Sequence, residues 1–120
     1  MTTFVLPADR VHEAAALCDY LVDRLDSDDT VHAVSTDSDA DSPQASRDSE
    51  DAQNAIYARL GAIATVDRHT DAVETQPKAL FAVGERSGAD EIIVGGIEDL
   101  DGQLLADAPC PVVVVPGADG

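Results

Sequence analysis

Short runs of aliphatic residues alternate along this chain with segments that have the spacing of amphipathic helices. Runs dominated by Val, Ile and Leu, without polar alternation, are typical of strands buried on both faces, as in a parallel sheet. The alternation therefore predicts an α/β domain with a doubly wound, open, mostly parallel sheet. The expected strands are 3–8, 30–35, a weaker run at 64–70, 91–96 and 111–116, and the expected helices are 11–25, 48–60, 77–88 and 99–107.

The first 35 residues show this pattern most clearly. In 11–25 the apolar residues, Cys18 among them, recur every three or four positions, which is the stripe of a helix that packs against a core. A strand precedes this helix and a strand follows it, so the segment is a βαβ unit with parallel strands and a right-handed crossover. We expect Cys18 to be a small buried side chain rather than a reactive thiol.

Proline and glycine mark the ends of the other elements. Pro77 suits the first turn of a helix, and Gly88 suits its end. Gly84, in the middle of that helix, costs about 1 kcal/mol relative to Ala, and a close contact between helix and sheet would explain it. Residues 36–47, rich in Ser and Asp, are expected to form a flexible acidic loop within a single domain that spans 1–120.

The charge of the chain excludes several partners. There are 24 acidic and 7 basic residues, a net charge of −17, so nucleic acid and anionic lipid should be repelled. The acidic residues are spread along the whole chain. This distribution favours adaptation to molar salt over an acidic surface made for basic partners, since the Debye length is about 3 Å at 1 M. No apolar run approaches the ~20 residues of a membrane span.

Few residues have the spacing of a catalytic or metal site. His12, His32 and His69 come from three separate elements, so no metal is expected. Cys18 and Cys110 fit no redox or metal motif. Met1 leads directly into a strand with no basic segment before it, so we expect a cytoplasmic protein with reduced thiols.

Three segments resemble the universal stress protein (UspA-type) family. They are Val-Leu-Pro-Ala-Asp at 5–9, Gly-Ala-Asp-Glu-Ile-Ile-Val-Gly at 88–95, and Ala-Pro-Cys-Pro-Val-Val-Val-Val-Pro at 108–116. The resemblance implies a five-stranded parallel sheet in the order 3-2-1-4-5 with helices on both faces. It also implies a homodimer, often paired through the last strand, which here comprises Val112, Val113, Val114 and Val115.

The family divides into members that bind ATP and members that do not. The resemblance implies a ligand at the carboxyl ends of strands one and four, where open α/β sheets bind ligands. Asp9 matches the family aspartate after strand one, although it could instead be only the N-cap of the following helix. Gly95 matches the first glycine after strand four. The candidate ligand residues are Asp9, Ser35, Thr36, Gly95 and Gly96.

The family's phosphate motif is incomplete in this chain. Glu98 stands where the motif has its second glycine, and no Gly-Ser or Gly-Thr pair follows. The connection Ile97 to Cys110 is close to the minimum length of a parallel crossover. Glu98, Asp99 and Asp101 would repel a triphosphate unless Mg²⁺ bridged them. We therefore expect no resident cofactor, with weakly held ATP and Mg²⁺ as the alternative.

Three functions remain in view. The favoured one is a non-enzymatic stress-response module that acts as a dimer, through protein contacts or a weakly bound small ligand. The second is a regulatory protein that binds ATP or AMP, with Asp9 at the base or ribose and Gly95-Gly96 at the phosphate. The third, an enzyme of the same broad fold, has no general base, metal cluster or arginine to support it; Ser35 and Thr36 have no His–carboxylate partner in the sequence pattern.

The excess of acidic residues predicts a fold that depends on salt. Lowering KCl from molar to dilute removes the screening of like charges, so the melting temperature should fall. Thermal unfolding at several KCl concentrations, followed by circular dichroism, measures this. An equal melting temperature at both extremes would contradict the assignment to a high-salt environment.

Overall fold

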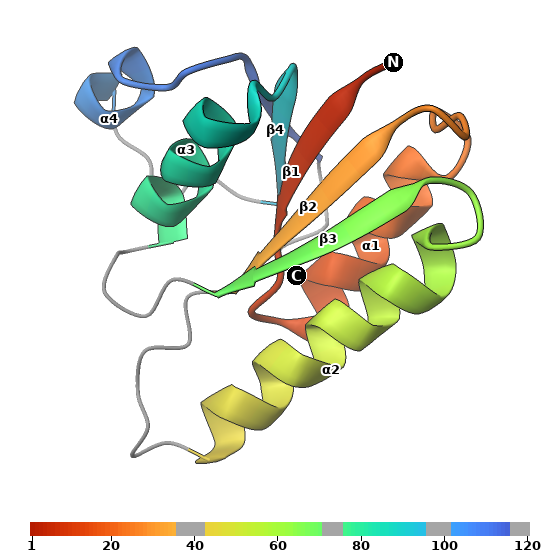
Figure 1. Cartoon of the computed structure of the whole chain (residues 1–120). Helices are drawn as coiled ribbons and strands as arrows, with labels where there is room; N and C mark the ends of the chain where they lie inside the picture. Colours follow the sequence, from red (N-terminus) through yellow and green to blue (C-terminus); the bar gives the residue numbers. More distant parts are fainter. Residues whose placement is uncertain (36–42, 71–75, 96–101, 116–120) are drawn as a thin grey trace.

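The elements follow one another in the predicted alternation (Figure 1). This computed structural model describes residues 1–35, 43–70, 76–95 and 102–115. In this part of the chain the elements are β1 (Thr3–Pro7), α1 (Val11–Leu21), β2 (Thr30–Ser35), α2 (Pro43–Leu60), β3 (Thr65–Thr70), α3 (Gln76–Ser87), β4 (Glu91–Val94), α4 (Gly102–Ala106) and β5 (Val112–Val114).

The strands form one parallel sheet in the order β3-β2-β1-β4-β5. This confirms the predicted fold class and strand order. β1 is the central strand: Phe4 lies opposite Val31 of β2 on one side and opposite Glu91 of β4 on the other. The two margins differ, since β3 exposes mostly polar side chains, among them Asp67 and Arg68, whereas β5 is made of valines.

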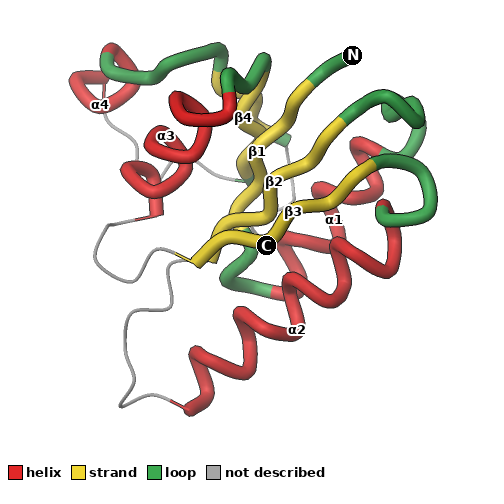
Figure 2. The backbone as a smooth tube through the Cα atoms, in the orientation of Figure 1, coloured by secondary structure: helices red, strands yellow, loops and turns green. Residues whose placement is uncertain are grey.

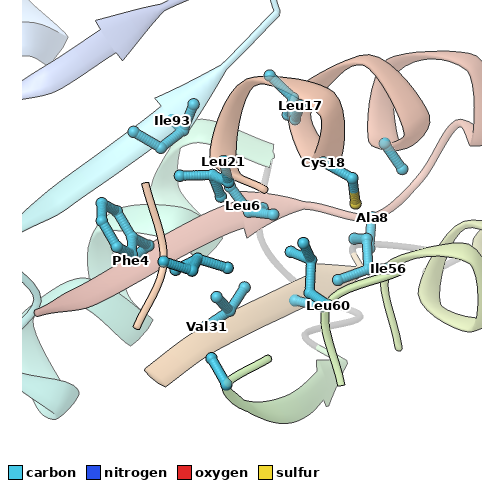
Figure 3. Packing of buried hydrophobic residues seen from close by; sticks show 14 of the residues in the cluster. Phe4, Leu6, Ala8, Leu17, Cys18, Leu21, Val31, Ile56, Leu60 and Ile93 are labelled. Atoms are coloured by element: carbon cyan, nitrogen blue, oxygen red, sulfur yellow. The ribbon is translucent and has the colours of Figure 1, made fainter. Parts of the chain in front are cut away.

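Each face of the sheet has its own hydrophobic cluster. Side chains alternate between the faces of a strand, so Leu6 points to the face covered by α1 and α2, and Val5 points to the face covered by α3 (Figures 1 and 2). Figure 3 shows the first cluster, where Leu6 lies among residues of α1 and α2. Cys18 is 1% exposed there, and burial raises the pKa of its thiol to about 12, which confirms it as an inert core residue.

The clearest differences from the predicted helix boundaries are at the end of α1 and at the start of α2. α1 ends at Leu21 rather than at residue 25, because the N–H groups of Arg24 and Leu25 both bond to the carbonyl of Leu21 in a tight turn. Leu25 stays buried after the turn, which is why it continues the helical pattern of the sequence. α2 begins at Pro43, five residues before the predicted start, so 43–47 is helix rather than loop. Residues 36–42 of that predicted loop lie outside the described residues.

The glycines of α3 behave as the sequence predicts. A Cβ on Gly84 would lie 3.3 Å from both Ile92 Cδ1 and Pro109 Cγ, so the helix packs unusually close to β4 at this position. Gly88 has a φ of 66°, the left-handed conformation that ends a helix and that glycine adopts without strain.

Two histidines meet on the α3 face of the sheet. His32 Nδ1 and His69 Nε2 are 2.8 Å apart, and Asp67 Oδ2 lies 3.9 Å from His32 Nδ1. The parallel register of β2 and β3 creates this pair, which residue spacing alone did not indicate. Burial is the main cause that lowers the pKa of each imidazole; the neighbouring His69 lowers that of His32 further, and Asp67 opposes both shifts.

The histidine pair predicts a loss of stability in mild acid. A depressed pKa means that the unfolded chain takes up protons first, so stability should fall as pH drops below about 6.5 toward the folded-state values. Urea unfolding in molar KCl between about pH 8 and pH 5 measures the slope. His32→Gln should make the slope shallower, and the exposed His12→Gln is the matched control. Equal slopes in wild type and His32→Gln would contradict this role.

Candidate functional site

The strand order places a switch point between β1 and β4. β1 leads into α1 on one face of the sheet, whereas α3 and α4, which flank β4 in the chain, lie on the opposite face (Figure 1). In such sheets the chain leaves two adjacent strands toward opposite faces, and ligands bind at the carboxyl ends of these strands. The described residues at this place are Ala8 to Arg10, the first turn of α1, and Gly95.

A buried glutamate spans the switch point. Glu13 lies in the first turn of α1 and is 3% exposed, and its Oε2 accepts a hydrogen bond from the N–H of Gly95 at 3.1 Å. The guanidinium of Arg10, whose side chain is 57% exposed, lies 3.5 Å from the same oxygen. Glu13 Oε1 is buried, and among the described residues it has no hydrogen-bond partner. One carboxylate therefore joins the start of α1 to the end of β4.

The surroundings of Glu13 favour its neutral form. Burial is the largest cause that raises the pKa of Glu13, and the charge of Asp9 raises it further. The Arg10 charge and the N–H of Gly95 act in the opposite direction without cancelling the effect of burial. A buried acceptor without a partner typically costs about 1–3 kcal/mol, and Glu13 lies at the position where open α/β sheets in general bind ligands.

Ser35 belongs to a network that holds three strands together. Its hydroxyl donates to the carbonyl of Ala8 at 2.8 Å and accepts from Gln53 Nε2 at 2.7 Å. Gln53, on α2, also donates to the carbonyl of His69 at 3.0 Å. The proton of the Ser35 hydroxyl is thus already used within the chain, and this arrangement ties the ends of β1, β2 and β3 to α2.

Asp9 faces α2 rather than forming the cap of α1. The hydroxyl of Ser49, on α2, donates to Asp9 Oδ1 at 3.2 Å. The N-cap position of α1 is Arg10, whose side chain makes no capping hydrogen bond. The expectation that Asp9 is the N-cap residue is therefore wrong by one position, because the extended backbone runs one residue further than the sequence indicates.

The candidate ligand residues lie at one end of the sheet. Asp9 directly follows Ala8, whose carbonyl accepts a hydrogen bond from Ser35. Gly95 donates its backbone N–H to Glu13 of α1. Thr36 and Gly96 lie outside the described residues. Sequence reasoning missed Glu13, Ser49 and Gln53. Glu13 did carry a signal, since it precedes the buried Leu17 and Leu21 by one and two helical turns and so belongs to the buried stripe.

Other kinds of site find little support. Among the described residues, no group of three or more His, Cys, Asp or Glu side chains could hold a metal ion. Cys110 is partly buried against the second cluster, and burial, together with Asp90 and Glu91, raises the pKa of its thiol. No described helix has both the length and the apolar character that a membrane crossing requires.

The fold is that of solved universal stress protein structures. A family protein from Burkholderia pseudomallei superposes with a TM-score of 0.67 at 18% identity, covering 97% of this chain and 96% of that one. A family protein from Arabidopsis thaliana with AMP bound gives 0.61 at 12% identity, covering 97% and 92%. A universal stress protein in complex with cAMP gives 0.55 at 14% identity, covering 96% of each chain. No protein-family model and no curated protein sequence matches this chain.

Proposed function

We propose that this chain, which has the universal stress protein fold, is a non-enzymatic member of that family that acts in the cytoplasm as a homodimer. It works through contacts with protein partners or through a weakly bound small ligand. The similarity to solved structures covers nearly the whole chain, and the segments at 5–9, 88–95 and 108–116 carry the sequence resemblance.

The observation that carries this proposal is the state of the polar groups at the switch point. The N–H of Gly95 is bonded to Glu13, and the hydroxyl of Ser35 is bonded to Ala8 and Gln53. Phosphate binding calls for free, clustered N–H donors at a helix N-terminus, and here the first such donor after β4 already has an internal carboxylate. This supports a weak ligand site over tight nucleotide binding.

The same groups argue against catalysis. A nucleophile needs an adjacent base that a third group orients. Ser35 donates to a backbone carbonyl instead, and its other contact is the neutral amide of Gln53. The Glu13 carboxylate contacts a backbone amide and an arginine, and neither would be activated by it.

The last strand supports assembly with a second copy. β5 pairs with β4 alone in the described sheet, so its outer edge is a margin. Val113 and Val115 pack toward the first cluster and Val112 toward the second, while Val114 is 41% exposed. An apolar strand at a margin is normally covered or paired, and a second β5 would cover it.

A regulatory nucleotide-binding protein is the alternative. The fold neighbours with AMP and cAMP favour it, with Asp9 at the base or ribose and Gly95-Gly96 at the phosphate. Glu13 would then have to release the amide of Gly95 before a phosphate could use it.

Calorimetric titration with ATP and Mg²⁺ in molar KCl separates the two functions. We expect no saturable binding in the micromolar range, because Glu13 and the acidic residues that follow β4 in the sequence oppose a triphosphate. Asp9→Ala is the control variant. Micromolar binding that Asp9→Ala abolishes would favour the nucleotide-binding alternative.

Substitution of an exposed valine tests the dimer. Val114→Arg should convert dimer to monomer in light scattering, because it places a charge at an exposed position of the strand that forms the edge of the sheet. Val113 is less suitable, since it packs against the core. Val22→Arg is the matched control, because Val22 is also 41% exposed but lies at the end of α1. A Val114→Arg protein that stays dimeric would rule out pairing through β5.

A further inference from the structure

The carboxylate of Glu13, which supports the weak ligand site of the proposed function, also bears on which ligands that site accepts. It lies on the one described backbone amide that leaves β4 at the switch point, and it bonds that amide at 3.1 Å. A ligand phosphate placed there would use the same N–H and would meet the same negative charge. Glu13 Oε2 therefore occupies the position that an external anion needs.

The second oxygen adds an independent observation. Within the described part of the chain, Glu13 Oε1 is buried without a hydrogen-bond partner, and the whole side chain is only 4% exposed. Buried polar atoms normally find a partner, so a group that lacks one in a ligand-binding position is a candidate for function. Burial without a partner also makes the ionised state costly, so Glu13 takes up a proton more readily than an exposed carboxylate. A neutral carboxyl accepts a weaker hydrogen bond than a carboxylate, so protonation should weaken the hold of Glu13 on Gly95.

We propose that Glu13 is an internal ligand of the switch point that determines its specificity by charge. While ionised, Glu13 occupies the amide of Gly95 and excludes ligands that carry phosphate; when neutral, it accepts a weaker hydrogen bond, so an anion can displace it from that amide. The site therefore accepts uncharged ligands while Glu13 is ionised and admits anions once it is protonated, so its affinity for anions rises as pH falls. This holds whether or not the chain forms the proposed dimer, and the test below does not depend on oligomeric state.

Few charged groups of the described residues lie near Glu13. Arg10 and Asp9, both on the segment that leads into α1, have opposite effects on it. From β4 the facing group is the uncharged N–H of Gly95, and α2 reaches this neighbourhood through the uncharged hydroxyl of Ser49, which bonds Asp9. Within the described residues, Glu13 is thus the titrating group that lies directly on the amide.

Two probes that differ in one charged group test the proposal. Cyclic AMP carries a single negative charge that does not change in mild acid, and adenosine has the same base and ribose without the charge. Each is titrated calorimetrically in molar KCl into wild type and Glu13→Gln, at about pH 7.5 and about pH 5. Glutamine keeps the shape and an acceptor oxygen but removes the charge. Urea midpoints verify that the variant is folded.

In wild type, affinity for cyclic AMP should rise between the higher and the lower pH, while affinity for adenosine stays constant. In Glu13→Gln, cyclic AMP should bind about tenfold more tightly than in wild type at the higher pH, and this affinity should not depend on pH. Glu85→Gln, which changes an exposed acidic residue on α3, is the matched control and should behave as wild type.

Three results would overturn the proposal. One is a Glu13→Gln protein that binds cyclic AMP no better than wild type, including one that does not bind it at all. Another is a pH dependence that persists in Glu13→Gln, which would assign it to the histidine pair or to other groups. The third is an equal gain for adenosine and cyclic AMP, which would show a change of shape rather than of charge.

Discussion

The burial of β1 on both faces is the constraint on which the rest of the structure depends. Val5 and Leu6 are fully buried, one against α3 and the other against α1 and α2, so each layer of helices is anchored to the same strand. β2 and β4 flank this strand in parallel. Since the chain leaves β1 toward one face and α3 and α4 lie on the other, the switch point at its carboxyl end is a consequence of that central position.

The polar groups at this switch point are not free to bind a ligand, although their position in the sheet suggests that they would be. Backbone amides at such a place are free to bind anions in many α/β proteins. Here the chain supplies its own carboxylate to Gly95, and α2 supplies Ser49 to Asp9 and Gln53 to Ser35. The polar groups therefore stabilise the junction of strands and helices, and any ligand has to compete with these internal bonds.

The sequence predicted the fold more completely than the site. Aliphatic runs place β1, β2, β4 and β5, since strands packed between layers of helices are rich in such residues, whereas the polar edge strand β3 gave only a weak signal. Gly84 indicates the tight contact of α3 with β4. Contacts between distant residues left weaker signals. The pairing of His32 with His69 follows from the register of two strands, and the bond of Glu13 to Gly95 crosses 82 residues. Leu25 is buried but lies beyond the helix, so the apolar pattern of the sequence placed the end of α1 too far along the chain.

The unlike margins of the sheet set a limit on growth. A sheet whose two edges can both pair with further strands can add copies indefinitely, as fibrils do. This sheet instead has valines along β5 and charged residues, Asp67 and Arg68 among them, along β3. Pairing of two β5 strands about a two-fold axis would leave the polar β3 edges outermost on both sides. Any assembly built on that edge closes after one addition, and at high protein concentration the same polarity protects the chain from polymerising.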